Sequence, residues 1–255
     1  MQQQLNFKFY ATLLDSFSQY VNSEAIWEKY WGYSENPPHT PEEFRQQQFQ
    51  SLIDRINRVP FDSEKADRGT AFNEVIDCMI LHKNSEKVKV QRVRGDNDGK
   101  VIGLNATYNS RTFFFPLEMV REFADYYQGA LPQQYIQAVL PTIFGNVLLY
   151  GYMDYVKPFC THDLKTTGQY SVGNYKNHWQ HRVYPYAMMM NGCNVPDFEY
   201  NICEIGKSYY HTYTESYSFV PDRDIPILTQ HCEDFIRFLQ TNRELITDKK
   251  IFNLR

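Results

Sequence analysis

The sequence lacks several features that would assign it to a class at once. No apolar run reaches the length of a membrane span, and no internal repeat or signal peptide is visible. Its five cysteines contain no C-x-x-C pair, which argues against zinc ribbons and clustered iron–sulfur ligands. We therefore expect a cytoplasmic protein with reduced thiols and no membrane partner.

An excess of basic charge is missing too. The chain has 26 Lys and Arg against 30 Asp and Glu, a net charge of −4, so its overall charge does not indicate nucleic-acid binding. A metal-dependent nuclease can still be mildly acidic, because its carboxylates are counted and its cations are not. Aromatic residues reach 16%, which core packing explains most simply and base stacking explains alternatively.

The chemistry of the chain is concentrated between residues 151 and 186. Val147 to Val156 is rich in β-forming residues and predicts a strand, and a second short strand is predicted from Phe159 to Lys165. Neighbouring strands would bring Asp154 close to Asp163. Lys165, two residues further on, would share the sheet face of Asp163 because side chains alternate along a strand.

Two converging carboxylates can hold a hard cation such as Mg²⁺ or Mn²⁺ through their oxygens. A lysine beside them, here Lys165, can orient a water or neutralise charge on a phosphate. The alternative is an Asp-x-Lys ion pair on a surface hairpin, worth only about 0–1 kcal/mol.

The order of predicted elements indicates one domain with a mixed sheet. Helices are expected over residues 7–31, from 41 to 60 and from 69 onward; a β-meander over 87–115; a helix over 116–127; strands over 135–165; a helix over 175–190; a hairpin over 198–219; and a helix over 225–246. This order predicts an α/β or α+β fold, a mixed sheet flanked by helices. The single domain, residues 1–255, would comprise an N-terminal helical segment (1–60), a core (61–220) and a C-terminal helix (222–247).

The ordered motifs resemble the PD-(D/E)XK nuclease superfamily, in particular its RecB-like exonuclease branch. The matching pieces are the opening segment Tyr10-Ala11-Thr12-Leu13-Leu14, the helix from Gly69 to Asp77 in place of G-x-x-x-H-x-x-x-E, the G-x-h-D strand Gly151-Tyr152-Met153-Asp154, the D-x-K-T strand Asp163-Leu164-Lys165-Thr166, and the Q-x-x-x-Y helix Gln180-His181-Arg182-Val183-Tyr184. Together they cover roughly residues 7 to 220.

The resemblance implies a restriction-endonuclease-like sheet with a metal site at the strand ends. It places the cation on Asp154 and Asp163 with the Leu164 carbonyl as a further ligand, the catalytic lysine on Lys165, and a residue that helps to place DNA or the site on Gln180.

The sequence departs from the branch on the helix that starts near Gly69. Asn73 stands in place of a metal-binding histidine, and Asp77 stands in place of a glutamate. Asn73 offers a neutral carbonyl oxygen, which is a weaker ligand, and Asp77 is one methylene shorter. The neighbouring Glu74 is an alternative acidic ligand.

The resulting expectation is an Mg²⁺- or Mn²⁺-dependent deoxyribonuclease, an exonuclease of DNA recombination or repair. DNA is its expected partner, with a homo-oligomer or a recombination protein as further candidates. The substitutions at Asn73 and Asp77 motivate an alternative, a DNA-binding module of the same fold with weakened or lost catalysis. A structural or assembly protein with incidental acids is the third reading.

Overall fold

The computed structural model describes residues 5–96, 99–207 and 209–252. The helices in this part are α1 (Ala11–Val21), α2 (Ser23–Trp31), α3 (Pro41–Ile56), α4 (Glu64–Leu81), α5 (Leu117–Tyr126), α6 (Gln180–Met190) and α7 (Pro221–Thr241), followed by the 3₁₀ turns η1 (Arg243–Leu245) and η2 (Lys249–Phe252). The strands are β1 (Leu5–Tyr10), β2 (Lys89–Arg94), β3 (Val101–Tyr108), β4 (Arg111–Pro116), β5 (Leu131–Thr142), β6 (Gly145–Val156), β7 (Cys160–Thr167), β8 (Asp197–Ile205) and β9 (Tyr210–Ser218).

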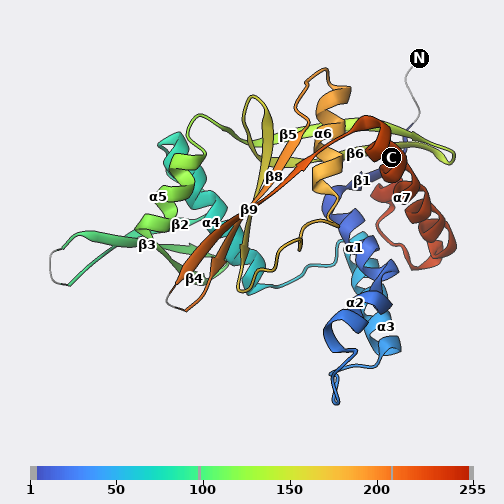
Figure 1. Ribbon diagram of the computed structural model, residues 1–255, viewed down its shortest axis with the longest axis horizontal. Coiled ribbons are helices and arrows are strands. Elements are labelled where there is room, and N and C mark those ends of the chain that lie inside the picture. The colour runs from blue at the N-terminus through green and yellow to red at the C-terminus, as the bar shows by residue number, and fades with distance from the viewer. Residues whose placement is uncertain (1–4, 97–98, 208, 253–255) are drawn as a thin grey trace.

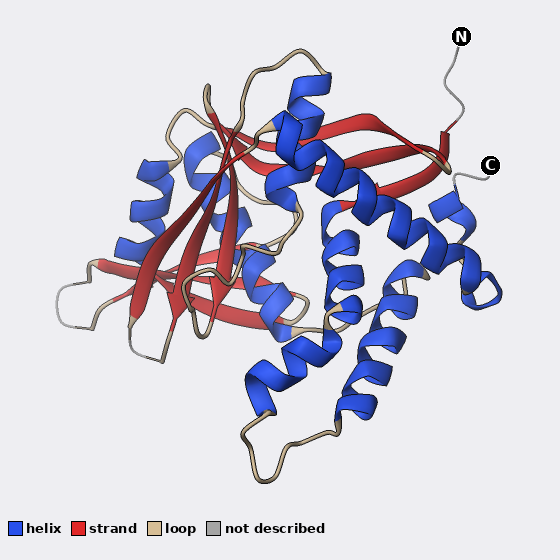
Figure 2. Ribbon diagram, turned by 45° about the vertical axis from the view of Figure 1, so that its right-hand side comes forward, coloured by secondary structure: helices blue, strands red, loops and turns tan. Residues whose placement is uncertain are grey.

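The fold is mixed α/β, as the element order predicted. One sheet has six strands in the order β1-β6-β7-β8-β9, with β5 also paired to β6, and a separate sheet of three strands has the order β2-β3-β4. Figure 1 shows α4, α5 and the smaller sheet on one side and α1, α2, α3 and α7 on the other. Figure 2 shows strands of the larger sheet between these two groups of helices, with further strands extending to the upper right. None of the helices in the described part is long and apolar enough to cross a bilayer.

Strand β6 organises the larger sheet because it has three partners. β5 pairs along its whole length and takes one edge. The other edge is shared: β1 runs parallel to it as far as Tyr150, and β7 runs antiparallel to it only at Tyr155 and Val156. Residues 151–154 therefore lie between two partners, at the point where β6 and β7 diverge.

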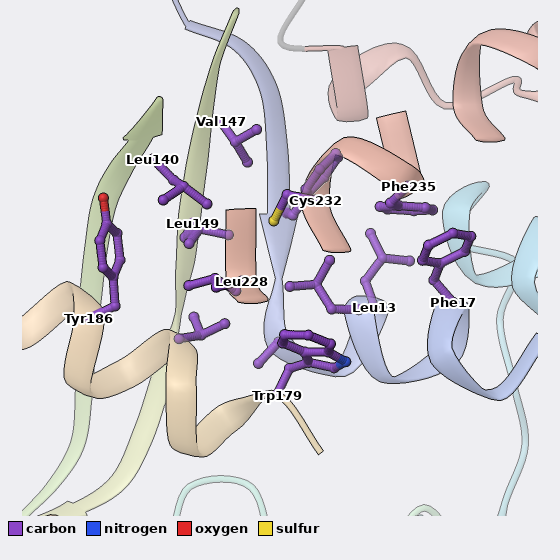
Figure 3. Close-up of a cluster of buried hydrophobic side chains, with 14 of the residues drawn as sticks. Leu13, Phe17, Leu140, Val147, Leu149, Trp179, Tyr186, Leu228, Cys232 and Phe235 are labelled. Atoms are coloured by element: carbon purple, nitrogen blue, oxygen red, sulfur yellow. The ribbon is translucent and has the colours of Figure 1, made fainter. Parts of the chain in front are cut away.

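Two buried clusters cover the larger sheet. The first joins α1, α3, α6 and α7 to β1, β5, β6 and β8, and includes Phe9, Leu149 and Phe235, each at 0% exposure. Figure 3 shows part of this cluster. The second joins α4, α5, β3 and β4 to Tyr155, Leu164 and Cys203 of the larger sheet. Burial of this much apolar surface is the main stabilising contribution to the fold.

The structure corrects three boundaries. Residues 7–10 belong to β1 and not to a helix, because Phe7 and Phe9 alternate into the first buried cluster. The segment 1–60 is therefore not wholly helical. Residues 175–179 precede α6, which begins at Gln180. The last long helix ends at Thr241; Asn242 is its C-cap and donates its backbone N–H to the Phe238 carbonyl, and short 3₁₀ turns follow.

Other predicted elements are present with small shifts. Helix α3 begins at Pro41 after a capping box in which Thr40 and Glu43 bond each other's backbone. Helix α4 begins at Glu64, capped by Ser63, five residues before Gly69. The meander and the closing hairpin match β2–β4 and β8–β9. Asn97 and Asp98 of the expected meander turn, and Ser208 of the hairpin, lie outside the described residues.

Candidate metal and nuclease site

Asp163 and Lys165 lie on the same face of β7, and their side chains meet. Lys165 Nζ is 2.6 Å from Asp163 Oδ2. The other oxygen of Asp163 accepts a hydrogen bond from the Gln180 side chain, which α6 supplies from above the sheet. Asp163 is 3% exposed and Gln180 is 4% exposed, so this is not a surface hairpin in solvent. The meeting of Asp163 with Lys165 matches the expectation from alternation along the strand, and Gln180 joins them from α6.

Asp154 faces this pair from the end of β6. Its Oδ2 accepts a 2.9 Å hydrogen bond from the backbone amide of Leu164, across the gap where the two strands separate. Burial, and then the negative charge of Asp163, raise the pKa of Asp154 to about 7, against the lowering effect of Lys165. The buried carboxylate of Asp163 and the half-buried carboxylate of Asp154 thus lie close enough to interact, and a positive charge beside them would stabilise both.

Lys165 supplies positive charge to this space. Burial alone would lower the pKa of its ammonium, but Asp163 and Asp154 outweigh that effect and raise it. Lys165 therefore stays protonated across the physiological range. A fixed cation beside two acids is the arrangement that the D-x-K spacing predicted, and it can interact with an anionic group that enters the site.

Helix α4 brings one of its three candidate ligands to the acids. The Asn73 amide lies 3.4 Å from Asp154 Oδ2, with its nitrogen facing that oxygen. Glu74 accepts a 2.8 Å hydrogen bond from Ser85. Asp77 lies near Tyr155, and burial raises its pKa to about 6, an effect to which Glu74 adds while Tyr155 opposes it. In the described part of the chain, no hydrogen bond joins Asp77 or Glu74 to Asp154 or Asp163.

Three side-chain oxygens on α4 and α6 are buried without a hydrogen-bond partner. They are Asn73 Oδ1, Asp77 Oδ1 and Gln180 Oε1. Buried polar atoms in native proteins are nearly always paired, and oxygen donors are what Mg²⁺ and Mn²⁺ prefer. Asp154 and Asp163 supply oxygen donors of the kind that these cations bind, whereas Asn73 and Gln180 direct their amide nitrogens to the two carboxylates. The predicted role of the Leu164 carbonyl stays a prediction, because the observed contact of that residue with Asp154 is made by its amide.

Two of the sequence motifs meet physically at Gly151. A Cβ built on this residue would lie 2.8 Å from the ring and the hydroxyl of Tyr184 on α6. Tyr184 is 5% exposed and packs in the first buried cluster. A glycine at the start of G-x-h-D is therefore required for α6 to approach β6, and this approach also carries Gln180 to Asp163.

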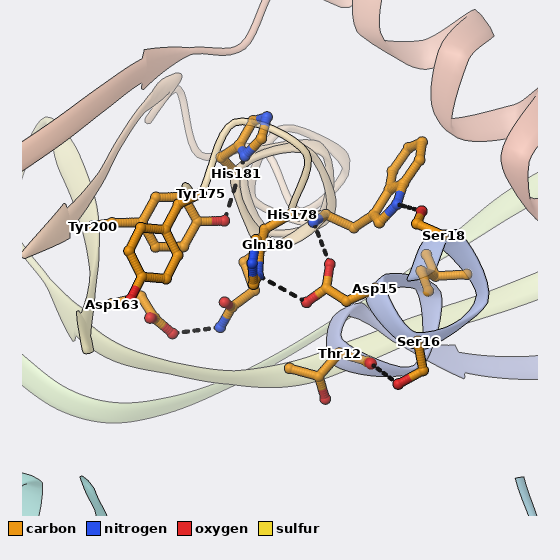
Figure 4. Close-up of polar contacts among 12 residues, drawn as sticks. Thr12, Asp15, Ser16, Ser18, Asp163, Tyr175, His178, Gln180, His181 and Tyr200 are labelled. Atoms are coloured by element: carbon orange, nitrogen blue, oxygen red, sulfur yellow. Dashed lines mark hydrogen bonds and ion pairs between the residues drawn. The ribbon is translucent and has the colours of Figure 1, made fainter. Parts of the chain in front are cut away.

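Asp15 on α1 holds the start of α6 and was missed by sequence reasoning. Its carboxylate accepts a 2.7 Å hydrogen bond from the Trp179 amide and lies 3.2 Å from His178 Nδ1. Figure 4 shows these contacts beside the bond between Gln180 and Asp163. Free amides at the start of a helix favour an acidic partner. The available signal was a carboxylate inside the apolar stripe of Leu13, Leu14 and Phe17.

A row of tyrosines lies on the strands that lead to Asp154. Tyr150 contacts Tyr10 of β1 at 5.9 Å between ring centroids, and Lys8 Nζ lies 4.7 Å from the Tyr150 ring centroid. Tyr152 contacts Tyr135 of β5 at 5.1 Å, and these two residues are 59% and 47% exposed. Alternation along β6 places Tyr150, Tyr152 and Asp154 at successive positions of one strand face. We call Lys8, Tyr10, Tyr135, Tyr150 and Tyr152 the tyrosine row.

Comparison with known proteins adds little. No family model and no curated protein matches the chain. The chain is similar to the crystal structure of SSO0001, with 10% sequence identity, a TM-score of 0.44, and coverage of 92% of this chain and 78% of that chain. A likeness this distant carries no argument about function, so the following proposal depends on the residues themselves.

Proposed function

We propose that this chain is an Mg²⁺- or Mn²⁺-dependent deoxyribonuclease, an exonuclease of DNA recombination or repair in the PD-(D/E)XK superfamily. The observation that carries the proposal is the convergence of Asp154, Asp163 and Lys165 where β6 and β7 diverge. An isolated ion pair would not bring a second, half-buried carboxylate beside it, because that costs free energy. Functional sites tolerate such a cost in free energy when the buried acids bind a ligand or take part in catalysis.

Asp154 and Asp163 would hold the cation, and the side-chain amides of Asn73 and Gln180 donate hydrogen bonds to these two carboxylates. A bound divalent cation supplies a water activated near neutral pH and compensates negative charge on the phosphate. Lys165 would orient that water and contact a non-bridging oxygen. Gln180 is a positioning residue, because it fixes Asp163 through a hydrogen bond, and Asp15 supports Gln180 by holding the first turn of α6.

DNA is the proposed substrate because of what surrounds the acids. The tyrosine row offers partly exposed rings and one ammonium group on strands that end at Asp154. Aromatic rings stack on bases without regard to sequence, and a cation follows the phosphate backbone. The mildly acidic net charge of −4 is compatible with this reading, since the acids of the site account for part of it.

The decisive experiment is metal-dependent cleavage of linear DNA by the full chain and by Asp163→Ala and Lys165→Ala. We expect cleavage with Mg²⁺ or Mn²⁺, no cleavage with chelator, and losses of a hundredfold or more in each variant. Asp222→Ala and Lys176→Ala, which change exposed residues of the same types, serve as matched controls and should retain activity. Undiminished cleavage by both site variants would refute the assignment.

A second candidate function, a DNA-binding module with weakened catalysis, is favoured by one contact. The Asn73 nitrogen faces Asp154, so its carbonyl oxygen is turned from that carboxylate. Asn73→His installs the residue that the RecB-like branch has there. If Asn73 limits catalysis, this variant should cleave DNA faster than the natural chain under the same Mn²⁺ concentration. DNA binding without turnover in both proteins would support the binding module, and neither DNA nor Mn²⁺ binding would support a structural role.

A further inference from the structure

The opposite face of β7 carries a second group of metal-binding side chains. Cys160 and His162 are two residues apart on β7, on the face away from Asp163 and Lys165. In the parallel ladder with β8, His162 is the direct partner of Glu199. One donor atom from each of Cys160, His162 and Glu199 lies within 4.8 Å of the other two. We call these three residues the β7–β8 cluster.

The imidazole of His162 is the centre of this cluster. Its Nδ1 lies 3.2 Å from Glu199 Oε2 and 3.2 Å from Asn201 Oδ1. The residue is 2% exposed, and its Nε2 has no hydrogen-bond partner. A buried imidazole nitrogen is normally paired with a protein group or with water. One nitrogen of this nearly inaccessible ring is therefore unpaired, and the other lies beside the Glu199 carboxylate, in a ring that belongs to a group of three possible metal ligands.

Surrounding groups hold the carboxylate and the ring in place. The Tyr126 hydroxyl donates to Glu199 Oε2 over 2.5 Å, and the Tyr127 hydroxyl donates to Asn201 Oδ1 over 2.6 Å. Such outer contacts orient metal ligands and raise their affinity. Tyr126 is also the last residue of α5, and a helix C-terminus favours a nearby cation. Lys157 already binds the Tyr126 carbonyl, so that particular oxygen is taken.

A cavity lies next to the cluster, and the cluster itself is exposed to solvent at Glu199. It has a volume of about 360 Å³, and Tyr126 and Asn201, both in contact with the cluster, belong to its wall. The Glu199 side chain is 24% exposed, whereas that of His162 is 3% exposed. An ion with three protein ligands could therefore take water as its fourth ligand.

We propose that Cys160, His162 and Glu199 bind a zinc ion. Sulfur, nitrogen and oxygen donors in one site suit borderline Zn²⁺ and not the hard Mg²⁺. A thiolate, a carboxylate and a neutral imidazole together carry a charge of −2, which balances Zn²⁺. Zinc would replace the thiol proton, so its binding would release one.

The zinc site is independent of the proposed nuclease function. Asp163 and Lys165 point to the α6 side of β7, where Gln180 lies, whereas His162 contacts Tyr126 and Tyr127 of the α5 side. The first donor set contains only oxygens and a lysine, and the second contains a thiol and an imidazole. Loss of one site should therefore leave the metal preference of the other intact.

The test uses Co²⁺ as a spectroscopic substitute for zinc in the full chain. A Co²⁺–thiolate bond gives a charge-transfer absorption that oxygen ligands do not produce. Co²⁺ bound to the acids of the nuclease site therefore does not contribute to this absorption. We expect this absorption in the natural chain and its loss on addition of Zn²⁺. Cys160→Ser should abolish it. Cys78→Ser, which changes another half-buried thiol beside Asp77, should retain it.

Glu199→Gln provides a second variant that keeps the thiol. It removes one anionic ligand, and we expect the Co²⁺ and Zn²⁺ affinities to fall at least tenfold. Circular dichroism of each variant shows whether it has folded. Absence of thiolate absorption in the natural chain, its persistence in Cys160→Ser, or its loss in Cys78→Ser alone would overturn the proposal.

Discussion

The two faces of β7 carry two kinds of donor set on one strand of eight residues. Asp163 and Lys165 face α6 and join Asp154, whereas Cys160 and His162 face α5 and join Glu199. The difference arises from the period of two in a β-strand, which directs successive residues to opposite sides of the sheet. In the two proposals above, one strand supplies a hard, oxygen-rich site and a softer, sulfur-containing site, and the two donor sets would prefer different ions.

The partners of each face explain why one set was visible in the sequence and the other was not. The acids come from β6 and β7, which are neighbours along the chain, and a short turn brings them together. Glu199 comes from β8 after the whole of α6, and only the parallel register sets it opposite His162. Long-range register has no local signature in a sequence. The absence of C-x-x-C pairs excluded clustered zinc motifs but not donors from two strands.

The largest expected effect is that a variant on each face of β7 abolishes the readout of its own site and leaves the readout of the other site unchanged. Asp163→Ala should reduce Mn²⁺-dependent DNA cleavage a hundredfold or more and leave the Co²⁺–thiolate absorption unchanged. Cys160→Ser should do the reverse, with cleavage within about threefold of the natural chain, a margin that corresponds to about 0.7 kcal/mol. Nuclease assays and absorption spectra of the same two preparations measure both effects. A variant that abolishes both readouts while folded would show that the two sites act as one.

The close approach of α6 to β6 at Gly151 gives the next prediction. Gly151→Ala should destabilise the protein by about 1–3 kcal/mol, because the new methyl group would meet Tyr184 at 2.8 Å. Gly168→Ala is a matched control with nothing within 4 Å of its Cβ. Urea unfolding measures both variants, and the double variant Gly151→Ala, Tyr184→Leu should recover part of the loss. Equal stability of Gly151→Ala and Gly168→Ala would contradict the packing argument.

The sequence predicted some of these elements and their contacts, and it missed others. Apolar runs and alternation predicted β6 and β7 and the meeting of Asp163 with Lys165. The strand β1 was missed because Phe9 lies four residues before Leu13 and so continues the helix spacing of the residues that follow; its pairing with the distant β6 shows that it is a strand. Asp15 was missed for a similar reason, since its amide partner at Trp179 is remote in sequence. Local periodicity does not predict contacts between residues that are far apart in the sequence.

The pH dependence of stability should differ between Asp154 and a neutral replacement. The pKa of Asp154 in the folded chain is about 7, above its unfolded value of 3.8, so the folded state holds a proton that the unfolded state releases. Its contribution to stability is present below the unfolded pKa and is lost as pH rises to about 7. Without divalent cations, Asp154→Asn should therefore stabilise the chain by roughly 2 kcal/mol more at pH 8 than at pH 5.

Urea unfolding at the two pH values, in chelator, checks this difference. Asp222→Asn, at an exposed position, is the matched control and should show no such pH dependence. A stabilisation by Asp154→Asn that is the same at pH 5 and pH 8 would mean that the carboxylate is not held protonated by its surroundings. Addition of Mn²⁺ at pH 8 should stabilise the natural chain and not Asp154→Asn.

The smallest expected effect concerns the tyrosine row. Tyr152→Ala should weaken binding of DNA by about tenfold, since one stacked base contributes about 1–3 kcal/mol. Tyr33→Ala is the matched control, because Tyr33 is fully exposed in the segment between α2 and α3. Fluorescence anisotropy with a labelled oligonucleotide, in Ca²⁺ or chelator to prevent cleavage, measures both. Equal affinities for the two variants would remove the tyrosine row from the DNA-binding surface.

Anomalous X-ray scattering from crystals soaked in Mn²⁺ tests the central claim most directly. The account predicts a manganese peak within bonding distance of carboxylate oxygens from both Asp154 and Asp163, lost in crystals of Asp163→Ala. The same map shows whether Asn73, Asp77 or Glu74 completes the coordination. A fully soaked crystal with no peak between the two aspartates, or with manganese bound elsewhere and unaffected by Asp163→Ala, would contradict it.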